Sequence, residues 1–105
     1  LANRENKFSL FSFLEQMANV GSEVERAIKW REKNNPNYSQ KAFERALELL
    51  DLTIADEKNK KRLKELLRVR EALVDYFLFD NTYNSTNQNW QNYFLAFNFA
   101  ARARY

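Results

Sequence analysis

The sequence predicts an all-α protein, folded as an antiparallel, up-and-down four-helix bundle. Its 105 residues include one glycine, Gly21, and one proline, Pro36, so the chain lacks the turn chemistry of a β-rich domain and favours long, uninterrupted helices. Hydrophobic residues make up 45% of the chain and charged residues 30%, which is too apolar for a disordered chain. At this length we expect residues 1–105 to form a single domain.

The first predicted helix spans residues 9–33. Its apolar positions recur at alternating spacings of four and three, so they share one helical face. The members of this stripe are Leu10, Leu14, Met17, Gly21, Val24, Ile28 and Arg31, widened by Phe13, Val20 and Ala27. Because a glycine inside a helix costs about 1 kcal/mol, Gly21 predicts a close crossing by another helix or a mild bend. The stretch 33–37, which contains Pro36, ends the helix.

Three further helices are expected, over residues 39–55, 57–79 and 88–104. Ser39 and Asp56 are residue types that cap the start of a helix, and the polar stretch 80–87 separates the last two helices. The apolar stripes consist of Phe43, Ala46, Leu47, Leu50 and Ile54, then Leu63, Leu66, Leu67, Leu73, Val74 and Phe77, then Trp90, Tyr93, Phe94, Phe97, Ala100 and Ala101. Short linkers favour antiparallel neighbours, which is the basis for the predicted bundle.

The composition removes most catalytic chemistry. The chain has no histidine and no cysteine, so it lacks an imidazole base, a thiol nucleophile and the ligands of a Cys/His zinc site. One glycine cannot make a glycine-rich phosphate loop. The carboxylate pairs Asp51/Asp56 and Asp75/Asp80 lie near helix ends, where capping explains them. We therefore predict a protein without enzymatic activity, cofactor or metal ion.

Membrane association and export are not expected. No apolar run approaches the roughly 20 residues of a membrane span. The stretch 1–7 carries charges of both signs, unlike a signal peptide. We predict a cytoplasmic protein.

A basic run covers residues 58–70. Seven cations and the single acid Glu65 give it a charge of +6, whereas the whole chain carries +3. Such a run could contact the phosphates of RNA or DNA, or another anion. The candidate contact residues are Lys60, Lys61, Arg62, Lys64 and Arg68. The competing interpretation is a solvated helix face, which is common on surface helices.

Arg70 lies on the apolar face of the third predicted helix. An unpaired buried charge costs several kcal/mol, so we predict a mostly buried ion pair with Asp51 or Asp75. Contact with a ligand or phosphate is the alternative.

Aromatic residues make up 15% of the chain and gather at its two ends. Phe8 and Phe11 point away from the first stripe, and Leu95 and Phe99 lie opposite the fourth. A monomeric bundle would expose these four side chains, and exposed apolar patches mark contact surfaces. They therefore predict a homo-oligomer or a surface for a protein partner.

Two stretches carry a resemblance to known proteins. Residues 42–50, AFERALELL, and 67–77, LRVREALVDYF, resemble segments of small prokaryotic helical proteins. At the level of the fold, the predicted bundle resembles the HEPN family of helical nucleases and nucleotidyltransferase partners. That family's ribonuclease motif needs a histidine a few residues after an arginine, so the resemblance implies a non-catalytic member. The chain is also similar in size and charge to basic bundles that accompany ribosomal RNA insertions or retroelement reverse transcriptases.

These observations predict a non-enzymatic interaction or accessory module that acts through self-association or protein partners. The alternative is an accessory protein that contacts RNA or DNA through the basic run. The oligomer surface and the basic run are separate features, so the two hypotheses can be tested separately.

Overall fold

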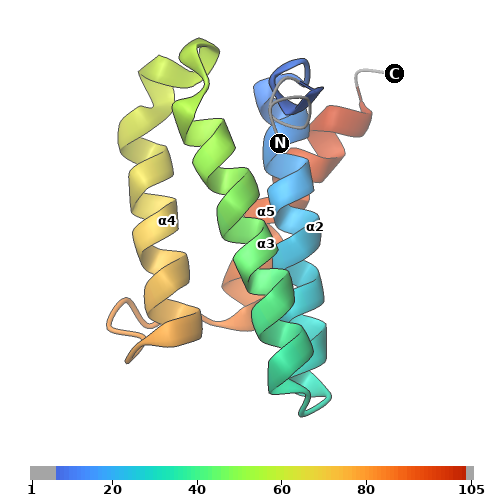
Figure 1. The fold of residues 1–105 in the computed structure, drawn as a ribbon, viewed down its shortest axis with the longest axis vertical. Coiled ribbons are helices and arrows are strands. Elements are labelled where there is room, and N and C mark those ends of the chain that lie inside the picture. Colours follow the sequence, from blue (N-terminus) through green and yellow to red (C-terminus); the bar gives the residue numbers. More distant parts are fainter. Residues whose placement is uncertain (1–6, 104–105) are drawn as a thin grey trace.

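The computed structural model describes residues 7–103, and all regular secondary structure within them is helical. The predicted all-α class is confirmed. The elements are α2 (Phe13–Glu32), α3 (Pro36–Ala55), the 3-10 helix η1 (Glu57–Arg62), α4 (Leu63–Leu78) and α5 (Asn87–Arg102) (Figure 1).

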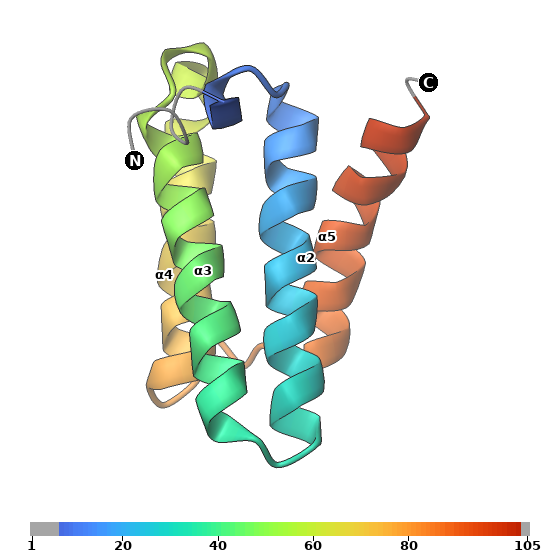
Figure 2. The same cartoon turned by 45° about the vertical axis from the view of Figure 1, so that its right-hand side comes forward.

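Successive long helices run in opposite directions, and α2 packs against both α3 and α5 (Figure 2). α4 packs against α3, whereas the backbones of α4 and α5 do not approach as closely as the other neighbours. Side chains span that wider gap: Tyr76 donates a hydrogen bond to Asn87, and Tyr93 donates one to Glu65. A regular four-helix bundle is therefore not confirmed by the helix packing.

The first long helix begins at Phe13, four residues later than expected. Ser12 and Glu15 form a capping box, in which each side chain accepts a hydrogen bond from the other's backbone N–H. This cap satisfies two N–H groups that a helix start leaves without partners. Residues 7–9 form a separate helical turn, and Leu10, expected in the core stripe, is exposed.

α3 begins at Pro36, and the expected cap at Ser39 was wrong. Asn35 caps the helix through Tyr38 N–H, and proline fits the first helical position because no N–H partner is needed there. Ser39 is instead buried, and its hydroxyl donates to the carbonyl oxygen of Ala27 over 2.8 Å. This hydrogen bond joins α3 to α2.

The third predicted helix is divided into η1 and α4, although Asp56 caps it as expected. The 3-10 segment contains Asn59, which is buried within the basic run. Its amide donates to the side-chain oxygen of Gln16 and to the backbone oxygen of Thr53. The tighter 3-10 turn accompanies this inward placement, and the α-helix starts at Leu63.

The core lies between α2, α3, α4 and α5. Its fully or nearly fully buried members include Met17, Val20, Val24, Ala27, Ile28, Phe43, Ala46, Leu50, Leu66, Leu73, Trp90 and Phe94. Gly21 faces Phe94 across the α2–α5 contact, which confirms the predicted close crossing. Leu63 and Leu67, expected on the core face of the third helix, are exposed.

Candidate interaction surfaces

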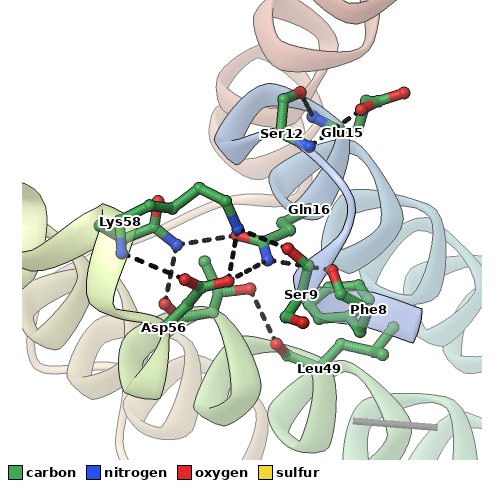
Figure 3. A network of polar contacts seen from close by, with 10 residues as sticks. Phe8, Ser9, Ser12, Glu15, Gln16, Leu49, Asp56 and Lys58 are labelled. Carbon is green, nitrogen blue, oxygen red and sulfur yellow. Dashed lines mark hydrogen bonds and ion pairs between the residues drawn. The ribbon is translucent and has the colours of Figure 1, made fainter. Parts of the chain in front are cut away.

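A polar cluster, buried at Gln16 and open to water at Lys58, ties the N-terminal turn to the corner between α3 and η1 (Figure 3). The Gln16 amide donates to the backbone oxygen of Phe8 and to a carboxylate oxygen of Asp56, over 3.1 and 2.9 Å. Lys58 donates to the same carboxylate and to the backbone oxygen of Ser9. Burial alone would raise the pKa of Asp56, but the hydrogen bonds from Lys58 and Gln16 outweigh it and hold this pKa below its usual value.

This polar cluster has a structural role, because it holds the N-terminal turn against α2 and the start of η1. Its members are directed at one another and at the backbone, and the buried Asn59 Oδ1 has no hydrogen-bond partner. Sequence reasoning identified Asp56 as a cap but missed Gln16 and Asn59. The available signal for Gln16 was its position next to Met17 of the apolar stripe, where a polar side chain needs hydrogen-bond partners.

Three cations of the basic run are engaged within the fold. Lys58 pairs with Asp56, and Arg70 pairs with Asp51. The Arg62 guanidinium lies 4.4 Å from the centre of the Phe13 ring, in a cation–π contact. Arg62, although exposed, is therefore less available to an external anion than expected.

The remaining four cations form what we call the basic face. They are Lys60, Lys61, Lys64 and Arg68. All four are exposed, and none makes an ion pair with a residue in the described part of the chain. They lie on η1 and the first half of α4, as the sequence predicted. Whether they bind an anion stays a prediction.

Arg70 pairs with Asp51, as one of the two alternatives predicted. The guanidinium Nε lies 2.7 Å from Asp51 Oδ1, and Nη2 lies 3.4 Å from Oδ2. The hydrogen bond to Asp51 raises the pKa of Arg70. The expected burial was wrong, because the two side chains remain 38% and 53% exposed. The pair lies at the rim between α3 and α4.

Asp75 does not pair with Arg70. Its buried carboxylate accepts hydrogen bonds from the backbone N–H groups of Thr82 and Tyr83. The loop 79–86 is folded back on α4 by these contacts and by the Tyr83 hydroxyl, which donates to Glu71 over 2.7 Å. Asp75 is therefore buried because the loop packs over it and donates hydrogen bonds to its carboxylate.

The folded loop and α4 enclose a groove of about 570 Å³. We call it the α4 groove. Its apolar walls are Leu67 and Val74 from α4, with Phe79 and Tyr83 from the loop. Phe79 is 71% exposed. Sequence reasoning missed this surface because it assigned Leu67 and Val74 to the core stripe.

α5 presents a second apolar surface, which we call the α5 face. Leu95 and Phe99 are 61% and 73% exposed, as predicted. The C-terminal half of α5 leans away from α2 (Figure 2). Arg102 is the one charged residue between Asn87 and Arg102. Because the whole chain is 30% charged, the near absence of charge along α5 was a further sequence signal that its outer side is a contact surface.

The other two residues of the predicted oligomer surface lie elsewhere. Phe8 is 6% exposed and packs in the core, so its expected exposure was wrong. The helical turn at residues 7–9 folds over the core and places Phe8 inside, with its backbone oxygen bonded to Gln16. Phe11 is partly exposed, and its ring meets that of Phe8 edge-on at 5.9 Å.

The comparisons with known proteins found no relative of this chain. No protein-family model matches the chain, and no curated protein or solved structure is similar enough to count as a match. The resemblance to HEPN-like bundles therefore stays a prediction.

None of the helices within residues 7–103 combines the length and apolar character needed to cross a membrane. That same part of the chain does not gather three or more acidic side chains as ligands for a metal ion.

Proposed function

We propose that this chain is a non-enzymatic interaction module that works by self-association through the α5 face. The observation that carries the proposal is the exposure of Leu95 and Phe99 on a helix with a single charged side chain. Burying a large apolar side chain contributes about 1.5–3 kcal/mol. Two such side chains in each copy supply a driving force for association, which acts against the translational and rotational freedom lost on binding.

The composition of α5 also supports an interface. The cores of protein interfaces are depleted of charged residues and enriched in aromatic ones. The outward-facing positions around Leu95 and Phe99 include Asn92 and Ala96, neither of which carries a charge. Arg102, three residues after Phe99, is the one charge on α5, so desolvating the positions around Leu95 involves at most one ion per copy, which keeps the cost of association low.

The proposed scaffold for this face is an antiparallel four-helix bundle working in the cytoplasm. The alternating helix directions and the side chains that span α4 and α5 support the bundle. In this arrangement α2 holds the inner side of α5, through Trp90 and Phe94. The outer side is left for a second copy.

Sedimentation or light scattering at micromolar concentration tests the proposal. The protein should exceed monomer mass, and Phe99→Asp should shift it toward monomer while its helical circular dichroism is retained. Phe79→Asp is the matched control, because Phe79 is equally exposed but lies at the α4 groove; it should leave the mass unchanged. A monomer at every concentration, or equal effects of the two substitutions, would refute self-association through α5.

A further inference from the structure

The turn between α2 and α3 carries an exposed pair of aromatic rings, which we call the aromatic pair. Trp30, in the last turn of α2, and Tyr38, in the first turn of α3, meet edge to face with ring centres 4.8 Å apart. Tyr38 is 50% exposed and Trp30 is half-buried. The turn forms the lower tip of the molecule (Figure 2), so a ligand can reach the pair from solvent.

Hydrogen bonds of the turn hold the two rings in place. The backbone N–H of Asn35 donates to the carbonyl oxygen of Trp30 over 2.9 Å, and the Asn35 side chain accepts from the Tyr38 N–H. Asn34 adopts the left-handed conformation of the turn, with φ of 60°, which asparagine tolerates better than most residues. Both ring-bearing residues are thus positioned before a ligand arrives, which lowers the ordering cost of binding.

A lysine lies beside each ring. Lys33 Nζ lies 5.2 Å from the centre of the Trp30 ring, and Lys41 Nζ lies 5.9 Å from that of Tyr38. Both lysines are exposed, neither makes an ion pair with a described residue, and each lies farther from its ring than Arg62 does. A cation–π contact at an exposed site is weaker than the stacking of a nucleic-acid base on the same ring. A base can therefore take the ring while the lysine turns to a phosphate.

A groove of about 760 Å³ lies on the same side of α2 and α3 as the aromatic pair. We call it the α2–α3 groove. Arg26 and Arg45 line it; because Arg26 precedes Trp30 by four residues and Arg45 follows Lys41 by four, they share the side of the rings. The apolar part of the lining consists of Phe8, Phe11, Leu49 and Leu52. Phe11 is exposed and supplies a further ring at the far end of the groove.

The charge along this side is positive. Five cations and three acids leave a net charge of +2: they are Lys7, Arg26, Lys33, Lys41 and Arg45, with Glu23, Glu44 and Glu48. The other acids of α2 and α3 are bonded elsewhere, to α5 from Glu25 and Glu32, to α4 from Asp51, and to the cap residue Ser12 from Glu15. Positive charge and exposed rings therefore occupy one surface.

We propose that the aromatic pair and the α2–α3 groove bind single-stranded nucleic acid. A base stacks on Tyr38 beside Trp30, and Lys33 and Lys41 meet the phosphates on either side of it, as on other stacking platforms for single strands. The rest of the strand follows the cations of the groove. A duplex keeps its bases stacked on one another and offers none to the rings, so the site selects single strands.

Two other classes of partner fit this surface less well. The interior of a protein interface is depleted of lysine, whereas a lysine flanks each ring here. A membrane surface would need apolar side chains to insert, and the stretch 29–41 contains no leucine, isoleucine, valine, methionine or phenylalanine.

The probe is an oligothymidylate of about 12 nucleotides, fluorescein-labelled for anisotropy and titrated at about 50 mM salt. It should bind saturably, and an unlabelled copy should quench the fluorescence of Trp30; Trp90, the other tryptophan, is buried. Tyr38→Ala should weaken binding about tenfold, whereas Tyr38→Phe, which keeps the ring, should bind as the parent does. Tyr83→Ala removes a similarly exposed tyrosine from the loop 79–86 and should leave binding unchanged.

Charge variants locate the phosphates. Lys33→Ala combined with Lys41→Ala should reduce the slope of log affinity against log salt by about 1.4, since each phosphate contact of a single strand contributes about 0.7. Lys60→Ala combined with Lys61→Ala removes the same charge from the basic face and is the matched control; it should change neither the slope nor the quenching. If Tyr38→Ala loses its helical circular dichroism, the two lysine pairs decide the test.

Duplex DNA of equal length and vesicles of anionic lipid complete the test, and neither should quench Trp30. The proposal is overturned if the strand does not bind or binds without quenching, if a folded Tyr38→Ala variant binds as tightly as the parent, or if the Lys60/Lys61 variant loses more affinity than the Lys33/Lys41 variant. Quenching by the duplex or by the vesicles equal to that by the strand would also overturn it. Because the α5 face takes no part, a failure here leaves the proposed self-association untouched.

Discussion

Gly21 and Phe94 are in direct contact where α2 and α5 cross. A Cβ atom at position 21 would lie 2.7 Å from Phe94 Cβ and 2.9 Å from Phe94 Cγ, closer than carbon atoms can approach without displacement. The atoms that would have to move are near the α5 backbone, so rotating a flexible side-chain end does not relieve the clash. The missing side chain therefore sets the separation of the two helices.

Gly21→Ala should lower the free energy of unfolding by about 1 kcal/mol. Alanine improves helix propensity by about 1 kcal/mol, but overpacking at a close contact costs about 1–3 kcal/mol, and the contact with Phe94 prevails. Urea denaturation measures the difference. Ser22→Ala, at the neighbouring exposed position, is the control and should stay within about 0.5 kcal/mol. A variant at position 21 more stable than the parent chain would contradict the close crossing.

The buried amides of Gln16 and Asn59 should be coupled. Gln16→Ala should cost about 3 kcal/mol, because it leaves a cavity and removes hydrogen-bond partners from Asn59 and Asp56. Asn59→Ala should cost about 2 kcal/mol, and the double variant should cost less than the sum, as expected for groups in one network. Gln40→Ala, on the exposed side of α3, is the matched control and should be near neutral. Additive losses would show that the two amides act independently.

Arg70→Ala should have a small effect despite the short contact with Asp51. Ion pairs between exposed side chains contribute about 0–1 kcal/mol. Asp75→Ala should cost more, about 2 kcal/mol, because two backbone N–H groups of the loop lose their acceptor. Thermal or urea unfolding of the two variants compares them directly. If Arg70→Ala is the more damaging substitution, the pair is more important than its exposure indicates.

Alkaline pH should destabilise the fold through Tyr93. Burial, then the charge of Glu65 and the hydrogen bond to it, raise the pKa of Tyr93 above its usual value. A raised pKa means that the folded protein keeps a proton that the unfolded chain loses above about pH 10. The stabilising contribution is complete below that pH and declines above it.

Tyr93→Phe should flatten the decline in unfolding free energy between about pH 9 and 12. The slope should not vanish, because the hydrogen bond to Glu71 also raises the pKa of Tyr83. Urea titrations at several pH values give the two curves. Parallel curves for parent and variant would show that Tyr93 ionises alike in the folded and unfolded states.

Local signals predicted much of the fold. Apolar spacing located the four long helices, and Asp56 was correctly identified as a cap because capping depends on neighbouring residues. Gly21 predicted a crossing because a glycine inside a stripe needs a compensating contact. The start of α3 was misplaced although Asn35-Pro36 was a sufficient signal, since proline favours the first helical position.

Contacts between distant segments could not be predicted in the same way. Phe8 is buried because the turn at residues 7–9 folds over the core, and Asn59 is buried because Gln16 meets it from α2. Arg70 lies on the apolar side of the third predicted helix, yet the edge of α3 leaves it half open to water. The α4 groove depends on where the loop 79–86 folds, which the spacing within α4 does not determine.

The uneven distribution of charge makes different surfaces of this chain respond differently to ionic strength. The Debye length is about 10 Å at 0.1 M salt and about 3 Å at 1 M, so concentrated salt would weaken any contact made through Lys64 and Arg68 of the basic face. The association of α5 faces involves a single charged side chain per helix and would persist. Dilute buffer therefore favours contacts of the basic face, and concentrated salt leaves the association between copies of the chain.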